Sequence, residues 1–135
     1  MTKQELQSYY WLRKNIEKLE HKLLELESEA TRVTTRITHD PRGGSSNSDK
    51  LGGIVAEIIA VQEKINSKLQ RSYVTMSGIE QATVELPERE AYLIRARYID
   101  CKSWEQIAVD MNYCWKQTHR IHSMALDMMR KDDTQ

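Results

Sequence analysis

Side chains suited to contacting a nucleic acid gather in a short stretch near the C-terminus, from Trp115 to Arg120. Lys116 and Arg120 are four residues apart, so on a helix they project from one face, one turn apart. Both donate hydrogen bonds that suit guanine edges, whereas Trp115 offers an indole donor and apolar contact. Gln117 and His119 are expected nearer the phosphates, where contacts position a protein without reading sequence. The stretch predicts a helix that faces a DNA duplex.

A metal site is the alternative chemistry for the same stretch. His119 and His122 are three residues apart, and Cys114 is close to both in the sequence. A tetrahedral zinc site needs further ligands, and the chain offers no second cluster. We therefore expect surface histidines beside a phosphate backbone, with no metal and no cofactor. Because no Ser/His/Asp arrangement, phosphate-binding loop or carboxylate pair with plausible geometry is present, we do not expect an enzyme.

Presenting these side chains to DNA requires a helix-turn-helix. Ser103 is a good N-cap for the first helix, and Gln106 completes a capping box. Asn112 accepts the left-handed conformation that a tight exit turn needs. Apolar residues at helical spacing form the inward stripe of the first helix, namely Trp104, Ile107, Ala108 and Met111. The second helix opens near Cys114, and its inward residues are expected to be Thr118, Ile121, Ala125 and Met128.

Residues that flank the helix-turn-helix complete the expected set of contacts. Lys102 and Ser103, at its start, are added to the candidate DNA contacts. Tyr98 and Trp104 are expected in the core. Arg97 is expected to pair with Glu90, seven residues earlier on the same helix face, with an exposed phosphate contact as the alternative.

The C-terminal segment resembles the fourth region of sigma-70-type transcription factors. In that family a helix beginning Leu-Pro-x-Arg-Glu and ending Arg-Tyr precedes a Ser-x-x-x-Ile-Ala unit and a recognition helix ending in Ala-Leu. Here those positions read Leu86-Pro87-Glu88-Arg89-Glu90, Arg97-Tyr98, Ser103, Ile107-Ala108 and Ala125-Leu126. The resemblance covers about 45 residues, mostly core positions, and implies a helix-turn-helix whose second helix contacts DNA. Because Trp115 and Lys116 stand where Arg and Glu are usual, and Cys114 replaces a capping hydroxyl, a −35 promoter preference is not implied.

The whole chain resembles small phage-encoded regulators of the ArpU-like and RinA-like type, in which a helical region precedes a sigma-like end. Residues Pro41 to Gly44, followed by Asp49-Lys50, are also similar to such proteins. The resemblance implies an activator of late phage genes. It also implies the cytoplasm of a bacterial host as its location and host RNA polymerase as a further partner.

The first two-thirds of the chain predict two long helices. Apolar residues in the first helix form a heptad seam, which is typical of a coiled coil. One seam position is taken by Tyr9, Ile16, Leu23, Ala30 and Ile37, and the other by Leu12, Leu19, Leu26 and Val33. The first helix is expected from about Gln4 to Thr38, and Pro41 to Ser48 interrupt it. Asp49 is expected to cap a second helix, whose stripe runs through Leu51, Ile54, Val55, Ile58, Val61, Ile65 and Leu69. Pro87 marks the start of the C-terminal segment.

Self-association is expected to use this seam. Its candidate dimerisation residues are Leu12, Ile16, Leu19, Leu23 and Leu26, which would form a large apolar patch if left uncovered. The two helices make an antiparallel hairpin, and the sequence leaves open whether the hairpin closes within one chain or between two.

Composition sets further limits. Only 39% of the 135 residues are hydrophobic, no run approaches the roughly 18 apolar residues of a membrane span, and the polar start is no signal peptide. Two isolated cysteines fit a reducing cytoplasm. The net charge is zero, and residues 76–135 hold 8 Lys/Arg against 10 Asp/Glu. Most DNA readers are basic, so we expect modest affinity from one copy and a need for dimerisation or a protein partner.

These observations predict an all-α protein with a helical hairpin at residues 1–85 and a sigma-region-four-like helix-turn-helix at residues 86–135. The expected function is sequence-specific binding of double-stranded DNA by a transcriptional regulator that forms a homodimer or higher oligomer. One alternative is an adaptor that binds RNA polymerase with weak or no DNA contact. Another is a recognition subunit for DNA packaging.

Overall fold

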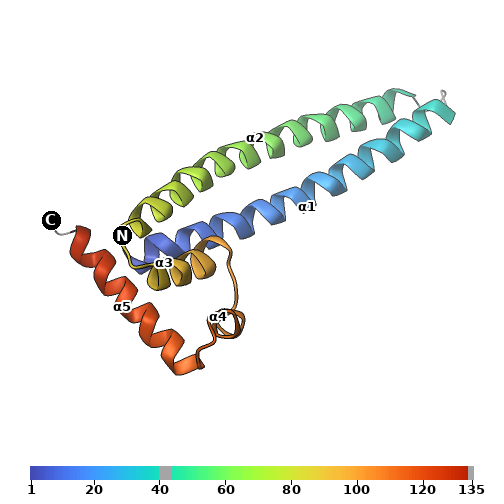
Figure 1. Cartoon of the computed structure of the whole chain (residues 1–135). Helices are drawn as coiled ribbons and strands as arrows, with labels where there is room; N and C mark the ends of the chain where they lie inside the picture. The colour runs from blue at the N-terminus through green and yellow to red at the C-terminus, as the bar shows by residue number, and fades with distance from the viewer. Residues whose placement is uncertain (40–43, 134–135) are drawn as a thin grey trace. The chain divides into compact units, whose positions relative to one another are not determined.

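The computed structural model describes residues 1–39 and 44–133. The chain is all-α, as predicted, and its described residues contain no strand. The elements are α1 (Lys3–His39), α2 (Gly44–Thr83), α3 (Glu88–Ile94), a π-helical segment η2 (Arg95–Ile99), α4 (Trp104–Met111) and α5 (Trp115–Asp133), shown in Figure 1. The described residues include no helix with the length and apolar character needed to cross a membrane.

The chain divides into two compact units. The terminal unit comprises residues 1–13 and 71–135, and the hairpin unit comprises residues 14–70. This division differs from the expected boundary between residues 85 and 86. The reason is that Leu6 and Tyr9 of α1 and Ile79 of α2 are buried in one cluster with Leu93 and Ile94 of α3. The ends of the two long helices therefore belong to the same unit as the C-terminal helices.

The hairpin unit is an antiparallel pair formed by α1 and α2. Ion pairs join Lys22 Nζ to Glu57 Oε1 at 3.4 Å and Lys50 Nζ to Glu29 Oε1 at 4.0 Å, so residue numbers rise on one helix as they fall on the other. The shared core comprises Ile16, Leu26 and Val33 of α1 with Ile54, Val61 and Ile65 of α2. The sequence left open whether the hairpin closes within one chain or between two, and in the structure it closes within one chain.

The proposed dimerisation residues are covered by this closure. Ile16 and Leu26 are buried in the hairpin core, and Leu19 and Leu23 are partly buried and pack against it. Leu12, in the terminal unit, is 9% exposed. A second chain is therefore not needed to remove the seam from water, and self-association through it stays a prediction.

The helix boundaries match the expectation in α1 but not at the start of α2. α1 runs from Lys3 to His39, within a residue of the expected range at each end. α2 begins at Gly44, so Asp49 lies inside the helix and the prediction that it caps is wrong. Pro41, expected to interrupt the helix, lies outside the described residues. Val55 is 43% exposed and does not belong to the buried stripe.

The C-terminal helices of the terminal unit pack around a common core. α3 begins directly after Pro87, as predicted, and α5 contacts both α3 and α4. The side chains of Leu93, Ile107 and Ile121 are 0% exposed, one from each of these helices. Met129, at 2% exposure, occupies the inward position expected for Met128, which is only partly buried. Met128 and Met129 follow Ala125 by three and four residues, and the residue at i+4, Met129, is the one that packs into the core.

A π-helical turn ends the α3–η2 helix. The amide of Asp100 donates to the carbonyl oxygen of Arg95 at 3.0 Å, five residues back, and Lys102 N donates to Ala96 O at 3.0 Å. Cys101 adopts a positive φ of 57°, an uncommon conformation for a residue with a Cβ. This turn reverses the chain and leads it into the cap of α4.

Candidate nucleic-acid interface

The α4–α5 pair has the local geometry of a helix-turn-helix. Ser103 Oγ accepts a hydrogen bond from Gln106 N at 3.2 Å and so caps α4, as predicted. The reciprocal half of the capping box does not form, because Gln106 Nε2 donates to Asp110 Oδ1 at 3.0 Å instead. Asn112 is left-handed, with φ 59° and ψ 36°, as predicted. Only Asn112, Tyr113 and Cys114 separate the two helices, a turn length typical of the motif.

Cys114 caps α5 with its thiol. Its Sγ lies 3.4 Å from the donating amide of Gln117, and its carbonyl oxygen accepts from Thr118 Oγ1 at 2.9 Å. The inward face of α5 then buries Thr118, Ile121 and Ala125 completely. A sulfur acceptor is weaker than a hydroxyl, but it occupies the same position. The start of α5 is therefore still capped, although Cys114 replaces the hydroxyl residue of the sigma-like pattern.

The opposite face of α5 carries the predicted contact residues. Lys116 and Arg120 are exposed, and Trp115 is 58% exposed. Gln117 is partly buried at the edge of this face. Among the described residues, neither Lys116 nor Arg120 forms an ion pair. The structure thus brings two uncompensated cations and an indole together on the first two turns of α5, a group of three residues that we call the α5 face.

His119 is not a surface histidine of the expected kind. Its ring lies between two indoles, with centroid distances of 4.3 Å to Trp104 and 3.9 Å to Trp115. Its Nε2 is buried and has no hydrogen-bond partner among the described residues. The partly buried ring therefore packs against both tryptophans, and its role as a phosphate contact beside Gln117 stays a prediction.

His122 is buried, so the prediction of a surface position is wrong. Its ring is 6% exposed, its Nε2 lies 2.6 Å from Tyr98 Oη, and its ring meets Trp104 edge-on at 4.7 Å. Burial lowers the pKa of His122 to about 4, and the charges of Lys3 and Arg97 act in the same direction. Burial also raises the pKa of Tyr98. At neutral pH the pair is uncharged and serves packing between η2 and α5.

The residues that precede α4 are held by local contacts. Lys102 Nζ lies 3.1 Å from Asp110 Oδ2, so this candidate DNA contact is already compensated in the protein alone. Arg97 donates from Nη1 to Lys102 O at 2.8 Å and stacks over the Trp104 ring at 4.7 Å. The expected Arg97–Glu90 pair is wrong: Glu90 is 2% exposed and binds Arg89 Nη2 at 2.6 Å. Helical spacing alone could not show that the π-turn rotates Arg97 toward α4.

A metal centre finds no support in the geometry. Within residues 1–39 and 44–133, no group of three or more His, Cys, Asp or Glu side chains is placed to hold an ion. Cys101 and Cys114 are not joined by a disulfide.

Comparisons with protein-family models, with curated proteins and with solved structures found no match to this chain. The geometry of α4 and α5 and the chemistry of the α5 face are therefore the guides to function.

Proposed function

We propose that this protein binds double-stranded DNA in a sequence-specific manner through the α5 face and regulates transcription. The observation that carries the proposal is the pair of exposed cations Lys116 and Arg120, which form no ion pair among the described residues. They lie on the first turns of a helix that follows a three-residue turn whose first residue, Asn112, is left-handed. The opposite side of the same helix buries Thr118, Ile121 and Ala125, so the core fixes which face of the helix carries the cations.

The proposed docking follows from helix dimensions. The major groove of B-DNA is about 12 Å wide and accepts an α-helix. Lys116 and Arg120 lie one turn apart, so both can reach base edges of the same groove. Arg120 is the better reader of guanine, because its planar guanidinium can bond O6 and N7 together. Gln117, at the edge of the face, is proposed to contact a phosphate.

The charge balance shapes the expected binding. Lys102 is paired with Asp110, and residues 76–135 carry slightly more acids than bases, so few counterions are released on binding. One copy should therefore bind weakly and with a gentle dependence on salt. Two copies on half-sites about 34 Å apart would raise the affinity. The resemblance to phage late-gene activators supports a regulatory role in the cytoplasm of a bacterial host.

Selection of duplexes from a random pool, followed by affinity measurement, tests this proposal. We expect Arg120→Ala to lose about 1–3 kcal/mol on the selected duplex and much less on a shuffled one. Arg130→Ala is the matched control, because Arg130 is also exposed on α5 but lies ten residues further along and bonds Asp127 at 2.6 Å. Equal losses for the two variants, or none for Arg120→Ala in a folded protein, would contradict the assignment.

A second candidate, an adaptor that binds RNA polymerase, is supported by a separate observation. Apolar side chains near the α5 face are well exposed: Val109 is 72% exposed, Met124 41% and Tyr113 38%. With a near-neutral charge, such a surface suits a protein partner better than a phosphate backbone. If the polymerase binds the protein without DNA, and Val109→Ser abolishes that binding while Arg120→Ala does not, the adaptor function leads.

A further inference from the structure

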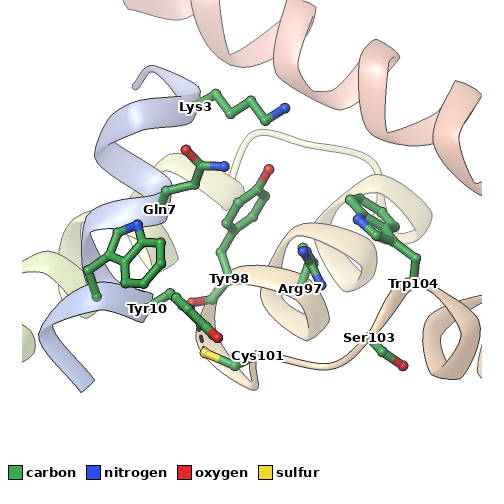
Figure 2. Close-up of a pocket in the computed structure, with 9 residues that line it drawn as sticks. Lys3, Gln7, Tyr10, Arg97, Tyr98, Cys101, Ser103 and Trp104 are labelled. Atoms are coloured by element: carbon green, nitrogen blue, oxygen red, sulfur yellow. Dashed lines mark hydrogen bonds between the residues drawn. The ribbon is translucent and has the colours of Figure 1, made fainter. Parts of the chain in front are cut away.

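A cavity of about 430 Å³ lies in the terminal unit, and none of the three residues of the α5 face lines it. Figure 2 shows the first turns of α1 on one side of it and the η2–α4 connection on the other. Its volume falls in the range of pockets that hold small molecules. Four aromatic residues line it, together with two cations and three small or polar residues: Tyr10, Trp11, Tyr98, Trp104, Lys3, Arg97, Gln7, Cys101 and Ser103.

The walls of this cavity suit a flat ring. Tyr10 and Trp11 meet edge to face at 5.0 Å on the α1 side, and Trp11 is 62% exposed although it is large and apolar. On the other side Trp104 is braced by the His119 ring at 4.3 Å, so its position is set by α5. Aromatic side chains recognise planar groups by stacking or edge contact, at separations of about 4.5–7 Å between ring centres.

The polar side of the cavity is positive. Lys3 and Arg97 are its charged residues, and among the described residues that line it none is an aspartate or glutamate. Arg97 is held in place by its hydrogen bond to Lys102 O and by the Trp104 ring, and a guanidinium has five donors in all. A ligand carrying negative charge would be favoured.

We propose that this cavity binds a small planar anion, an aromatic ring bearing a carboxylate or a phosphate. The ring would lie against Trp11 on the α1 side of the cavity, and the anionic group would contact Lys3 and Arg97. Duplex DNA fits this chemistry poorly, since the flat faces of its bases are stacked on one another and are not free to stack on an indole. The proposal does not depend on the function assigned to the α5 face.

A titration followed by the indole N–H signals of Trp11, Trp104 and Trp115 in ¹⁵N-labelled full-length protein tests the site. The probes are 1-naphthoate and adenosine 5′-monophosphate, which carry the two anionic groups. Inorganic phosphate supplies the anion without the ring, and 1-naphthalenemethanol supplies the ring without the charge. We expect saturable shifts of Trp11 and Trp104 with at least one planar anion, a smaller shift of Trp115, and at least tenfold weaker binding of the two incomplete probes.

Two exposed residues provide variants that should fold normally. Lys3→Gln and Trp11→Ala are each expected to weaken the planar anion about tenfold, whereas Lys18→Gln and Tyr73→Ala, exposed controls outside the cavity, should leave its affinity unchanged. The proposal is overturned if no planar anion gives saturable shifts at millimolar concentration. It is equally overturned if inorganic phosphate binds as well, or if Lys3→Gln and Trp11→Ala bind like the wild type.

Discussion

At the scale of single residues, the two histidines of α5 both pack against tryptophan rings. His119 lies between Trp104 and Trp115, and His122 lies under Trp104 with its Nε2 bonded to Tyr98. The spacing of Lys116 and Arg120 was enough to predict one shared face, because that follows from helical periodicity. The burial of His122 could not be predicted in the same way. It depends on where Trp104, from another helix, places its ring.

His122 should make stability depend on pH. Its pKa is about 4 in the folded protein and about 6.5 when unfolded, so the unfolded state binds more protons between these values. Stability is then lost as the pH falls below about 6.5. We expect the free energy of unfolding of the wild type to fall by about 2 kcal/mol more than that of His122→Gln between pH 7.5 and pH 5.

Urea unfolding at the two pH values measures this difference. His21→Gln, at an exposed position of α1, is the control and should retain the full pH dependence of the wild type. An unchanged pH dependence in His122→Gln would show that the histidine titrates normally in the folded protein.

At the scale of elements, the turn between α4 and α5 fixes the direction of the α5 face. Asn112 reverses the chain in the left-handed region, and the amide of Tyr113 donates to Ala108 O at 3.1 Å. The sequence predicted this turn because asparagine tolerates that conformation. The early start of α2 at Gly44 was not predicted, since glycine and serine have low helix propensity.

Substitution at Asn112 tests the turn. Asn112→Ala should lower the free energy of unfolding by about 1 kcal/mol, because a Cβ without a compensating polar group disfavours positive φ. Asn112→Gly should remain close to the wild type, since glycine adopts this conformation readily. Thermal and urea unfolding of the two variants gives the comparison. A stability order in which alanine exceeds glycine would mean that Asn112 is not left-handed in solution.

At the scale of the whole molecule, the chain covers its heptad seam with its own second helix. The heptad predicted α1 and the apolar stripe of α2, but a seam pattern is the same for a hairpin and for a dimer. Only the paired positions in the structure, such as Lys22 with Glu57, show closure within one chain. The division into two units could not be predicted from the sequence either, because it depends on which apolar residues at the ends of α1 and α2 pack into the C-terminal core.

Leu26 and Leu24 offer a matched pair to test this closure. Leu26 is 8% exposed in the hairpin core and Leu24 is 61% exposed on the same helix. Leu26→Ala should cost about 2–5 kcal/mol of stability, and Leu24→Ala less than about 0.5 kcal/mol. Sedimentation should give both variants the same mass as the wild type. If Leu26→Ala stays folded while its sedimenting mass falls by half, the seam joins two chains in solution.

The most direct test of the central claim is to select duplexes from one random pool with the wild type and with Arg120→Ala in parallel. We expect the wild type to enrich a defined motif. We expect Arg120→Ala to enrich the same motif with the preference relaxed at one base pair of each half-site. Failure of the wild type to enrich any motif, or an identical motif from both proteins, would contradict reading of DNA by the α5 face.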